Sequence, residues 1–183
     1  VLIYAVVIGA SAYDEYFPLV ADDHGAALET IPWLIGLVVT GQVVGTALAG
    51  RTAGMSGPTM SRVLLLAAVL ISAGALVSPY VGFAAIAVGY GLLNNAMVVS
   101  EARLQDVITG PARATVTSMA GLATEVVALA VYAGFALTSG LVSVPVQVAA
   151  LGVPLVAVAL FTKRALPPSP GGTDPRSGGG GGP

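Results

Sequence analysis

The chain has 183 residues, of which 56% are hydrophobic and only 9% are charged, and its mean hydropathy is +0.90. A soluble domain normally carries about a quarter charged residues, so this composition excludes a water-soluble fold and requires lipid around most of the surface. The net charge of −2 comes without a basic patch, which excludes a nucleic-acid-binding module, and the absence of cysteine excludes disulfides and thiolate metal sites.

Six apolar stretches are long enough to cross a bilayer as helices, for which about 20 residues are needed. The predicted spans are residues 1–21, 31–50, 62–79, 81–100, 114–137 and 143–162. They must be helices because lipid offers no partner to an unpaired backbone group. The sequence therefore predicts an all-α membrane protein with six transmembrane helices and both ends on the same side.

The basic residues orient these spans, because cytoplasmic loops are enriched in Lys and Arg. All seven lie in every second gap between spans: Arg51 and Arg62, then Arg103 and Arg113, then Lys163, Arg164 and Arg176. The intervening gaps contain no basic residue. This alternation predicts a multi-pass protein of the cell membrane with cytoplasmic amino and carboxy ends.

The two ends of the chain differ in character. The chain opens on apolar Val1-Leu2-Ile3, without Met or a basic flank, which favours a fragment whose cytoplasmic start lies upstream. The alternative is a complete small protein. Residues 165–183 are rich in Pro and Gly and predict a disordered cytoplasmic tail after a transmembrane bundle of residues 1–164.

Glycines recur along the second span. Gly36, Gly41, Gly45 and Gly50 share this helix, and Gly41-Gln-Val-Val-Gly45 forms a GxxxG pair. Small residues at this spacing let two helix backbones approach closely. The pattern predicts a tight helix–helix contact, with a pore-lining role as the alternative.

The fifth span carries the most costly buried group. Glu125 follows Arg113 by twelve residues, or about 18 Å of helix, which places it near the middle of the membrane. It belongs to a stripe of small or polar residues at helical spacing: Thr117, Gly121, Glu125, Ala128 and Tyr132. Intramembrane carboxylates usually face a bundle interior or an aqueous cavity. The stripe predicts a substrate or proton site at Glu125 and Tyr132; the alternative is a structural acid bonded to a neighbouring helix.

Further polar residues lie on three other spans. Asp14 and Glu15 are adjacent in the first span, so at most one carboxylate points into a cavity, and the alternative is that both are solvated at the outer interface. Gln42 on the second span and Asn94 on the fourth are candidates for substrate contact, with interhelical hydrogen bonding as the alternative.

Charged residues on the inner side are candidates for a gate. Arg51 and Arg62 flank one inner loop, and Glu101, Arg103, Asp106 and Arg113 populate the next. Opposite charges on adjacent loops form ion pairs that hold a gate closed; the alternative is that the basic residues are topology anchors.

Sites for metals, cofactors and enzymatic chemistry are not predicted. The single histidine, His24, follows Asp22 and Asp23 on a polar outer segment. So short a run predicts a solvated loop and not a metal site. No HExxH motif, nucleophile elbow or phosphate-binding loop occurs. The sequence therefore predicts a protein without metal or cofactor that is not an enzyme.

Two segments resemble the carboxy-terminal half of a major facilitator superfamily transporter, as found in bacteria. Gly45-Thr-Ala-Leu-Ala-Gly-Arg51 resembles the degenerate second copy of that family's inner-loop motif, although Gly50 stands where the family has Asp, so only Arg51 carries over. Pro111-Ala-Arg113-Ala-Thr-Val-Thr-Ser118 resembles the segment that leads into the eleventh helix. The likeness covers residues 1–164.

The resemblance implies two three-helix repeats, corresponding to helices seven to twelve, and an amino-terminal six-helix half as partner. It also implies alternating access, in which two bundles rock around a midplane site. The predicted function is half of a proton-coupled secondary transporter for a small solute. The alternatives are a complete half-size carrier or channel acting as a homodimer, or a structural membrane subunit.

Overall fold

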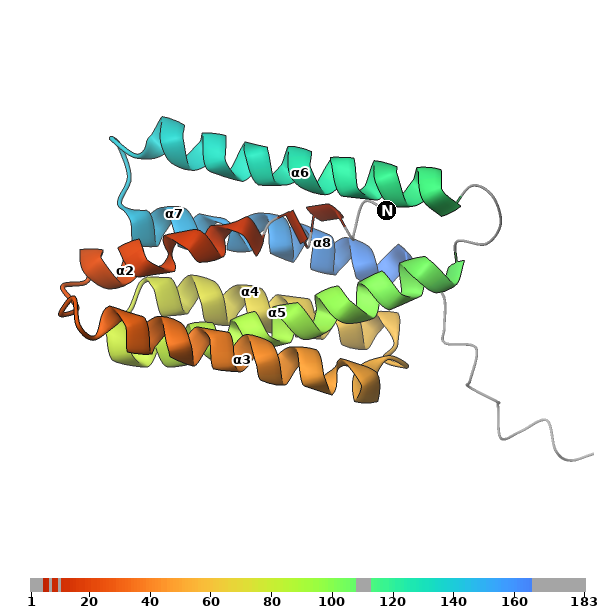
Figure 1. Cartoon of the computed structure of the whole chain (residues 1–183), viewed down its shortest axis with the longest axis horizontal. Helices are drawn as coiled ribbons and strands as arrows, with labels where there is room; N and C mark the ends of the chain where they lie inside the picture. The colour runs from red at the N-terminus through yellow and green to blue at the C-terminus, as the bar shows by residue number, and fades with distance from the viewer. Residues whose placement is uncertain (1–4, 7, 10, 108–112, 166–183) are drawn as a thin grey trace, which may run out of the picture.

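The computed structural model describes residues 5–6, 8–9, 11–107 and 113–165, and the elements it assigns there are all helices, without any strand (Figure 1). In chain order they are the 3₁₀ helix η1 (Ser11–Tyr16) and the α-helices α2 (Phe17–Asp23), α3 (Ile31–Thr52), α4 (Gly57–Ala75), α5 (Pro79–Val107), α6 (Arg113–Thr138), α7 (Val144–Ala150) and α8 (Gly152–Ala165). The predicted all-α class is confirmed.

Five helical stretches are long and apolar enough to cross a membrane: Ile31–Thr52, Gly57–Ala75, Pro79–Asp106, Ala114–Thr138 and Val144–Thr162. The chain is therefore a multi-pass membrane protein. These stretches match the second to sixth predicted spans. The first predicted span lies partly outside the described residues, so the count of six stays a prediction. The predicted tail lies almost wholly outside the described residues.

Two helix boundaries differ from the prediction. Helix α4 begins five residues before residue 62, because the Ser56 hydroxyl accepts a hydrogen bond from the Thr59 amide at 3.3 Å and Pro58 occupies the first turn. Helix α5 continues to Val107, seven residues past residue 100. Glu101, Arg103 and Asp106 thus lie on a helix and not in a loop, because hydropathy detects lipid contact while helix formers such as Glu, Arg and Gln prolong the helix into water.

The last span is broken between α7 and α8 at Leu151. Pro154 has no amide hydrogen to donate to the carbonyl of Ala150, four residues earlier, so a continuous α-helix cannot form there. Both short helices nevertheless pack along α4, and the Ser72 hydroxyl of α4 donates to the Ala149 carbonyl of α7 at 2.9 Å. The two short helices act as one bent span.

The predicted close contact of the second span is present between α3 and α5. A Cβ atom added at Gly41 would lie 2.1 Å from the carbonyl oxygen of Ala87, and one at Gly45 would lie 1.9 Å from that of Gly91. A Cβ at Gly36 or Gly50 would meet nothing within 4 Å. The GxxxG pair is therefore the part of the glycine series that brings the backbones together.

We call the close contact of α3 with α5 at Gly41 and Gly45 the glycine seam. Hydrogen bonds between polar side chains and the backbone reinforce it. The Asn95 amide on α5 donates to the Gly45 carbonyl at 3.0 Å, and the Thr52 hydroxyl donates to the Asn95 carbonyl oxygen at 3.0 Å. Asn95 is buried, and its bond to Gly45 forms away from water, while its bond with Thr52 is part-buried. They tie α3 to α5 where the glycines leave the α3 backbone accessible.

His24 is not the solvated loop residue that the sequence predicts. Its Nε2 atom lies 2.8 Å from the Ala75 carbonyl oxygen, in a part-buried contact. Ala75 is the last residue of α4, and carbonyls at a helix end have no partner within the helix. His24 thus ties the loop after α2 to the end of α4.

Helix α6 lies along one edge of the bundle and α3 along the opposite edge (Figure 1). Helix α6 contacts mainly η1 and α7, and much of its apolar surface is exposed, including Met119, Leu122 and Leu129. Both edge helices thus present large faces to their surroundings.

The glycine seam generates a stability prediction with a matched control. Gly45→Ala places a methyl group against the Gly91 carbonyl and is expected to lower the free energy of unfolding by about 1–3 kcal/mol. Gly50→Ala, on the same helix with open space around it, is expected to leave it unchanged or raise it slightly, since Ala is the better helix former. Thermal unfolding in detergent, followed by circular dichroism, measures both. Equal stabilities of the two variants would contradict the close packing of α3 on α5 at Gly45.

Candidate functional site

Within the first predicted span, the helix type changes from 3₁₀ to α between Tyr16 and Phe17. Helix α2 begins at Phe17 with Pro18 in its first turn, and Pro18 cannot donate to the Asp14 carbonyl four residues earlier. The residues up to Tyr16 are wound as the 3₁₀ helix η1. Because side chains at i and i+3 align in a 3₁₀ helix, Asp14 and Phe17 lie on one side. Such a break inside a helix often marks a hinge.

Asp14 and Phe17 both contact Tyr90 of α5. The Tyr90 hydroxyl donates to the Asp14 Oδ2 atom at 2.6 Å, which is in the range of a charge-assisted bond. The Phe17 ring packs edge-on against the Tyr90 ring with centroids 5.6 Å apart. Asp14 is half-buried and Tyr90 is buried. The carboxylate is therefore held by one specific donor on a neighbouring helix.

This hydrogen bond lies near the middle of the bundle. Tyr90 follows Pro79, the first residue of α5, by eleven residues, or about 16 Å of helix. The hydrocarbon core of a bilayer is about 30 Å thick, so Tyr90 and its partner Asp14 lie close to half depth. Asn94, one turn further along α5, is buried and donates to the Tyr90 carbonyl at 2.9 Å.

The second carboxylate, Glu15, turns toward α6. The carboxylates of Glu15 and Asp14 both act electrostatically on the Tyr132 hydroxyl, and Glu15 itself is exposed. Beside it, Tyr16 stacks on Phe135 with ring centroids 3.7 Å apart. Asp14 is thus bound to α5 while Glu15 is exposed beside α6, and the expectation that at most one of the two points into a cavity stays a prediction.

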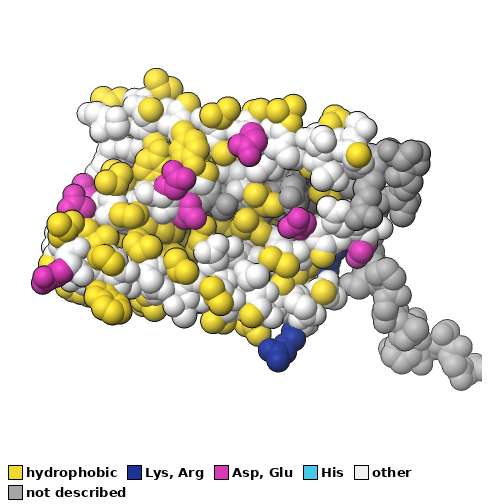
Figure 2. All heavy atoms as spheres, viewed as in Figure 1, with side chains coloured by type: hydrophobic (Ala, Val, Ile, Leu, Met, Phe, Trp, Pro, Cys, Tyr) yellow, Lys and Arg dark blue, Asp and Glu magenta, His cyan; other side chains and the backbone are white. Residues whose placement is uncertain are grey.

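We call Asp14, Glu15, Tyr90 and Tyr132 the carboxylate–tyrosine cluster. It joins the first span to α5 on one side and to α6 on the other. In Figure 2, several acidic side chains lie on the viewed face of the bundle. An arrangement of this kind can bind and release protons or bind a cationic or hydrogen-bonding solute.

Glu125 lies on the same stripe of α6 as Tyr132, seven residues earlier. Thr117, Gly121 and Glu125 are exposed, while Ala128 and Tyr132 are half-buried. Glu125 has no hydrogen bond or ion pair with any other residue in the part of the chain that the structure describes. An ionised carboxylate at this depth is not stable against hydrocarbon, so water or protein must cover the stripe.

The remaining candidates on α3 and α5 are Gln42 and Asn94, and both lie next to residues that hold helices together. Gln42 is half-buried on α3, on the helix that forms the glycine seam. Asn94 is buried next to the cluster through Tyr90, so it stays a candidate contact. Asn95, the next residue in the chain, donates a hydrogen bond to the Gly45 carbonyl of α3.

The inner charges contact backbone and not one another. Arg103 donates from its Nη2 atom to the carbonyls of Ala53, at 3.0 Å, and of Met55. It thereby caps the end of α3, where a cation is favoured. Arg62 donates to the carbonyl of Pro58, one turn earlier in its own helix, at 3.4 Å.

Arg51, Arg62, Glu101 and Asp106 are exposed, and no ion pair joins them within residues 11–107. Arg113 opens α6, and its side chain lies outside the described part of the chain. The predicted inner gate is thus not closed by ion pairs among the described side chains.

Tyr90 is the functional residue missing from the sequence-based candidates. It precedes Asn94 by one helical turn and shares its polar face, which is a signal in the sequence. Its pairing with Asp14 joins residues 76 positions apart, and no local pattern encodes that separation.

Comparison with known protein families, curated proteins and solved structures finds no match to this chain. The site must therefore be interpreted from its own chemistry. No group of three or more His, Cys, Asp or Glu residues suited to a metal ion occurs among the described residues.

The Asp14–Tyr90 bond generates a second stability prediction. Tyr90→Phe leaves the half-buried carboxylate without its donor and is expected to lower the free energy of unfolding by about 1–3 kcal/mol. Tyr80→Phe removes a hydroxyl from an exposed side chain at the outer end of the same helix and should be neutral. Denaturation of both variants in detergent tests this, and equal stabilities would show that the bond contributes nothing.

Proposed function

We propose that the chain is one half of a secondary active transporter that moves a small solute across the cytoplasmic membrane by alternating access, coupled to protons. The observation that carries this proposal is the Asp14 carboxylate, held by Tyr90 near half depth at a break in the first span. Ionisable groups inside a membrane bundle mark substrate and proton pathways, and transporters place their sites at discontinuous helices.

The cluster offers a physical route from proton binding to movement. When Asp14 is ionised, its carboxylate accepts a charge-assisted bond from Tyr90, which holds the first span against α5. When Asp14 is protonated, that bond loses its charge and weakens. Proton occupancy therefore changes how firmly η1 is tied to α5, and the 3₁₀ segment provides the joint at which the first span bends.

The exposed stripe of α6 supports a partner bundle. Glu125 needs a polar environment, and a second six-helix half across from α3 and α6 supplies it by enclosing an aqueous cavity between the halves. A second copy of this chain would cover the same stripe, which is the homodimeric alternative. In either arrangement the carboxylate–tyrosine cluster and Glu125 face the same central space.

The contacts among helices are compatible with the resemblance to major facilitator superfamily transporters. Helix α3 packs along α5, η1 packs against α6, and α4 packs along α8. Two three-helix repeats related by a pseudo-two-fold axis pair their elements in this way, with the first three spans matched to the last three. The same proposal places both ends in the cytoplasm, on the side of the basic residues.

Proton coupling is tested by transport in proteoliposomes that contain the full-length protein. With a panel of small solutes, we expect a pH gradient to drive uptake of the transported solute, and Asp14→Asn to abolish the gradient dependence. Glu29→Gln removes an exposed acid from the outer loop and is the matched control. Gradient-driven uptake that persists at full strength in Asp14→Asn would overturn the proton role.

The aqueous cavity is tested by cysteine labelling, because the chain has no cysteine of its own. Gly121 lies on the stripe and Leu122 beside it lies on the other exposed flank of α6 at the same depth. A thiol ionises in water and not in hydrocarbon, so Gly121→Cys is expected to react at least about tenfold faster than Leu122→Cys with a water-soluble maleimide. Equal rates would mean that lipid surrounds the stripe.

A further inference from the structure

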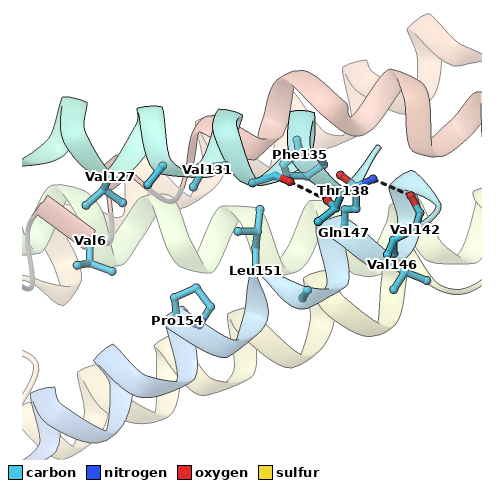
Figure 3. Close-up of a pocket in the computed structure, with 13 residues that line it drawn as sticks. Val6, Val127, Val131, Phe135, Thr138, Val142, Val146, Gln147, Leu151 and Pro154 are labelled. Carbon is cyan, nitrogen blue, oxygen red and sulfur yellow. Dashed lines mark hydrogen bonds between the residues drawn. The ribbon is translucent and has the colours of Figure 1, made fainter. Parts of the chain in front are cut away.

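Two of the cavities between the helices differ in their lining. The larger, of about 560 Å³, lies between α6 and the bent last span, and its described lining carries no charged side chain (Figure 3). Nothing in that lining identifies an occupant. A smaller cavity, of about 360 Å³, lies among α3, α4 and α5, and Arg51 lines it. A cationic side chain restricts the occupant, because it favours an anion.

The packing of the helices explains why this smaller cavity exists. Helices α3 and α4 each pack along α5, but they make little contact with one another. The crevice between them therefore has α5 as its floor, where Gly91, Leu92 and Asn95 line it. Leu48 of α3, which also lines it, is exposed. The crevice thus opens to the surroundings of the bundle.

Arg51 lies at the level of the lipid headgroups. It follows Ile31, the first residue of α3, by twenty residues, or about 30 Å of helix, which equals the thickness of the hydrocarbon core. Trp33, near the other end of α3, is exposed, as is typical of an aromatic residue at a membrane interface. Gly45 lines the cavity six residues before Arg51, about 9 Å deeper. The cavity therefore extends from the headgroup level into the hydrocarbon.

A second guanidinium group adjoins the mouth of this cavity. Arg62 of α4 bends back toward the start of its helix, where its Nε atom donates to the Pro58 carbonyl and its Nη2 atom to the Thr59 hydroxyl, each at 3.4 Å. Thr59 lines the cavity. Arg51 and Arg62 are both exposed, and neither forms an ion pair with another described residue. Two positive charges without an acidic partner thus lie at the same end of the crevice.

The other polar groups of the lining already have partners. The Thr52 hydroxyl donates to the Asn95 carbonyl oxygen, and the Asn95 amide donates to the Gly45 carbonyl. The Thr59 hydroxyl is hydrogen-bonded to that of Ser56 at 2.9 Å. No acid occurs among the described residues that line the cavity. The guanidinium groups at the mouth are therefore the part of this site that is left for a ligand.

The geometry points to a binding site for an anionic phospholipid in the crevice between α3 and α4. The phosphate accepts hydrogen bonds from Arg51 and Arg62, since a guanidinium group presents paired N–H donors that match phosphate oxygens. One acyl chain lies along the apolar part of the lining, which Leu48, Met55 and Val63 provide.

The depth of the cavity favours a lipid over a soluble phosphate compound. A soluble anion would occupy only the mouth, whereas an amphiphile fills both the mouth and the apolar part. Basic pockets between transmembrane helices bind anionic headgroups in the same way. A lipid bound here also joins α3 to α4, which make little contact of their own. The site is independent of the carboxylate–tyrosine cluster and of solute transport.

The test is lipid retention by the full-length protein, measured by native mass spectrometry with dioleoyl phosphatidylglycerol and dioleoyl phosphatidylcholine. These lipids have the same acyl chains, and only the first has a net negative charge. An arginine at the membrane surface contributes about fivefold to the binding of an anionic lipid, so we expect the glycerol lipid to be retained about 25-fold better. Arg51→Gln and Arg62→Gln should each lower this ratio to about five.

Arg176→Gln removes the same charge from the carboxy-terminal segment and is the matched control, for which the ratio should stay unchanged. Equal retention of both lipids by the native protein would overturn the proposal. So would an equal fall of the ratio in Arg51→Gln and Arg176→Gln, because net charge alone would then attract the lipid. An excess of glycerol 3-phosphate, which has the phosphate without acyl chains, should leave retention of the glycerol lipid unchanged. Its displacement would assign the site to a soluble phosphate compound and contradict the lipid.

Discussion

The hydrocarbon interior of the membrane offers no hydrogen-bond partner, and the rest of this structure depends on that constraint. It requires helices, and it requires that polar side chains within them find partners on neighbouring helices. Asn95 does so at the Gly45 carbonyl and Asp14 does so at Tyr90. Two groups, the Glu125 carboxylate and the Gln147 Oε1 atom, find no partner among the described residues. Glu125 lies on α6 and Gln147 lies on α7.

The same constraint separates what could be predicted from what could not. Hydropathy predicts five of the spans because a lipid-facing helix must be apolar along its whole length, and the Gly41–Gly45 pair predicts the seam because only glycine admits so close a backbone. Helix α5 continues seven residues past the predicted end of its span, since a helix does not stop where the lipid stops. The pairing of Asp14 with Tyr90, and the contact of His24 with Ala75, depend on how distant segments pack.

These features combine into one account of movement. The 3₁₀ helix η1 gives way to α2 at Phe17, and of its two carboxylates Asp14 is tied to α5 while Glu15 lies by α6. Helix α6 in turn has few protein contacts. The glycine seam and the α4–α8 contact form the tightly packed part of the bundle. Under the proposed function, the proton site at Asp14 would lie outside that tightly packed part, on η1.

A double-mutant cycle between Asp14 and Tyr90 tests the central claim most directly. The free energy of unfolding is measured in detergent for the native chain, Asp14→Ala, Tyr90→Phe and the double variant. If the carboxylate and the hydroxyl form the bond that ties the first span to α5, the two changes are non-additive, with a coupling of about 1.5–3 kcal/mol for a bond to a charged group. Additive effects would contradict the account, because the first span would then be held without this bond.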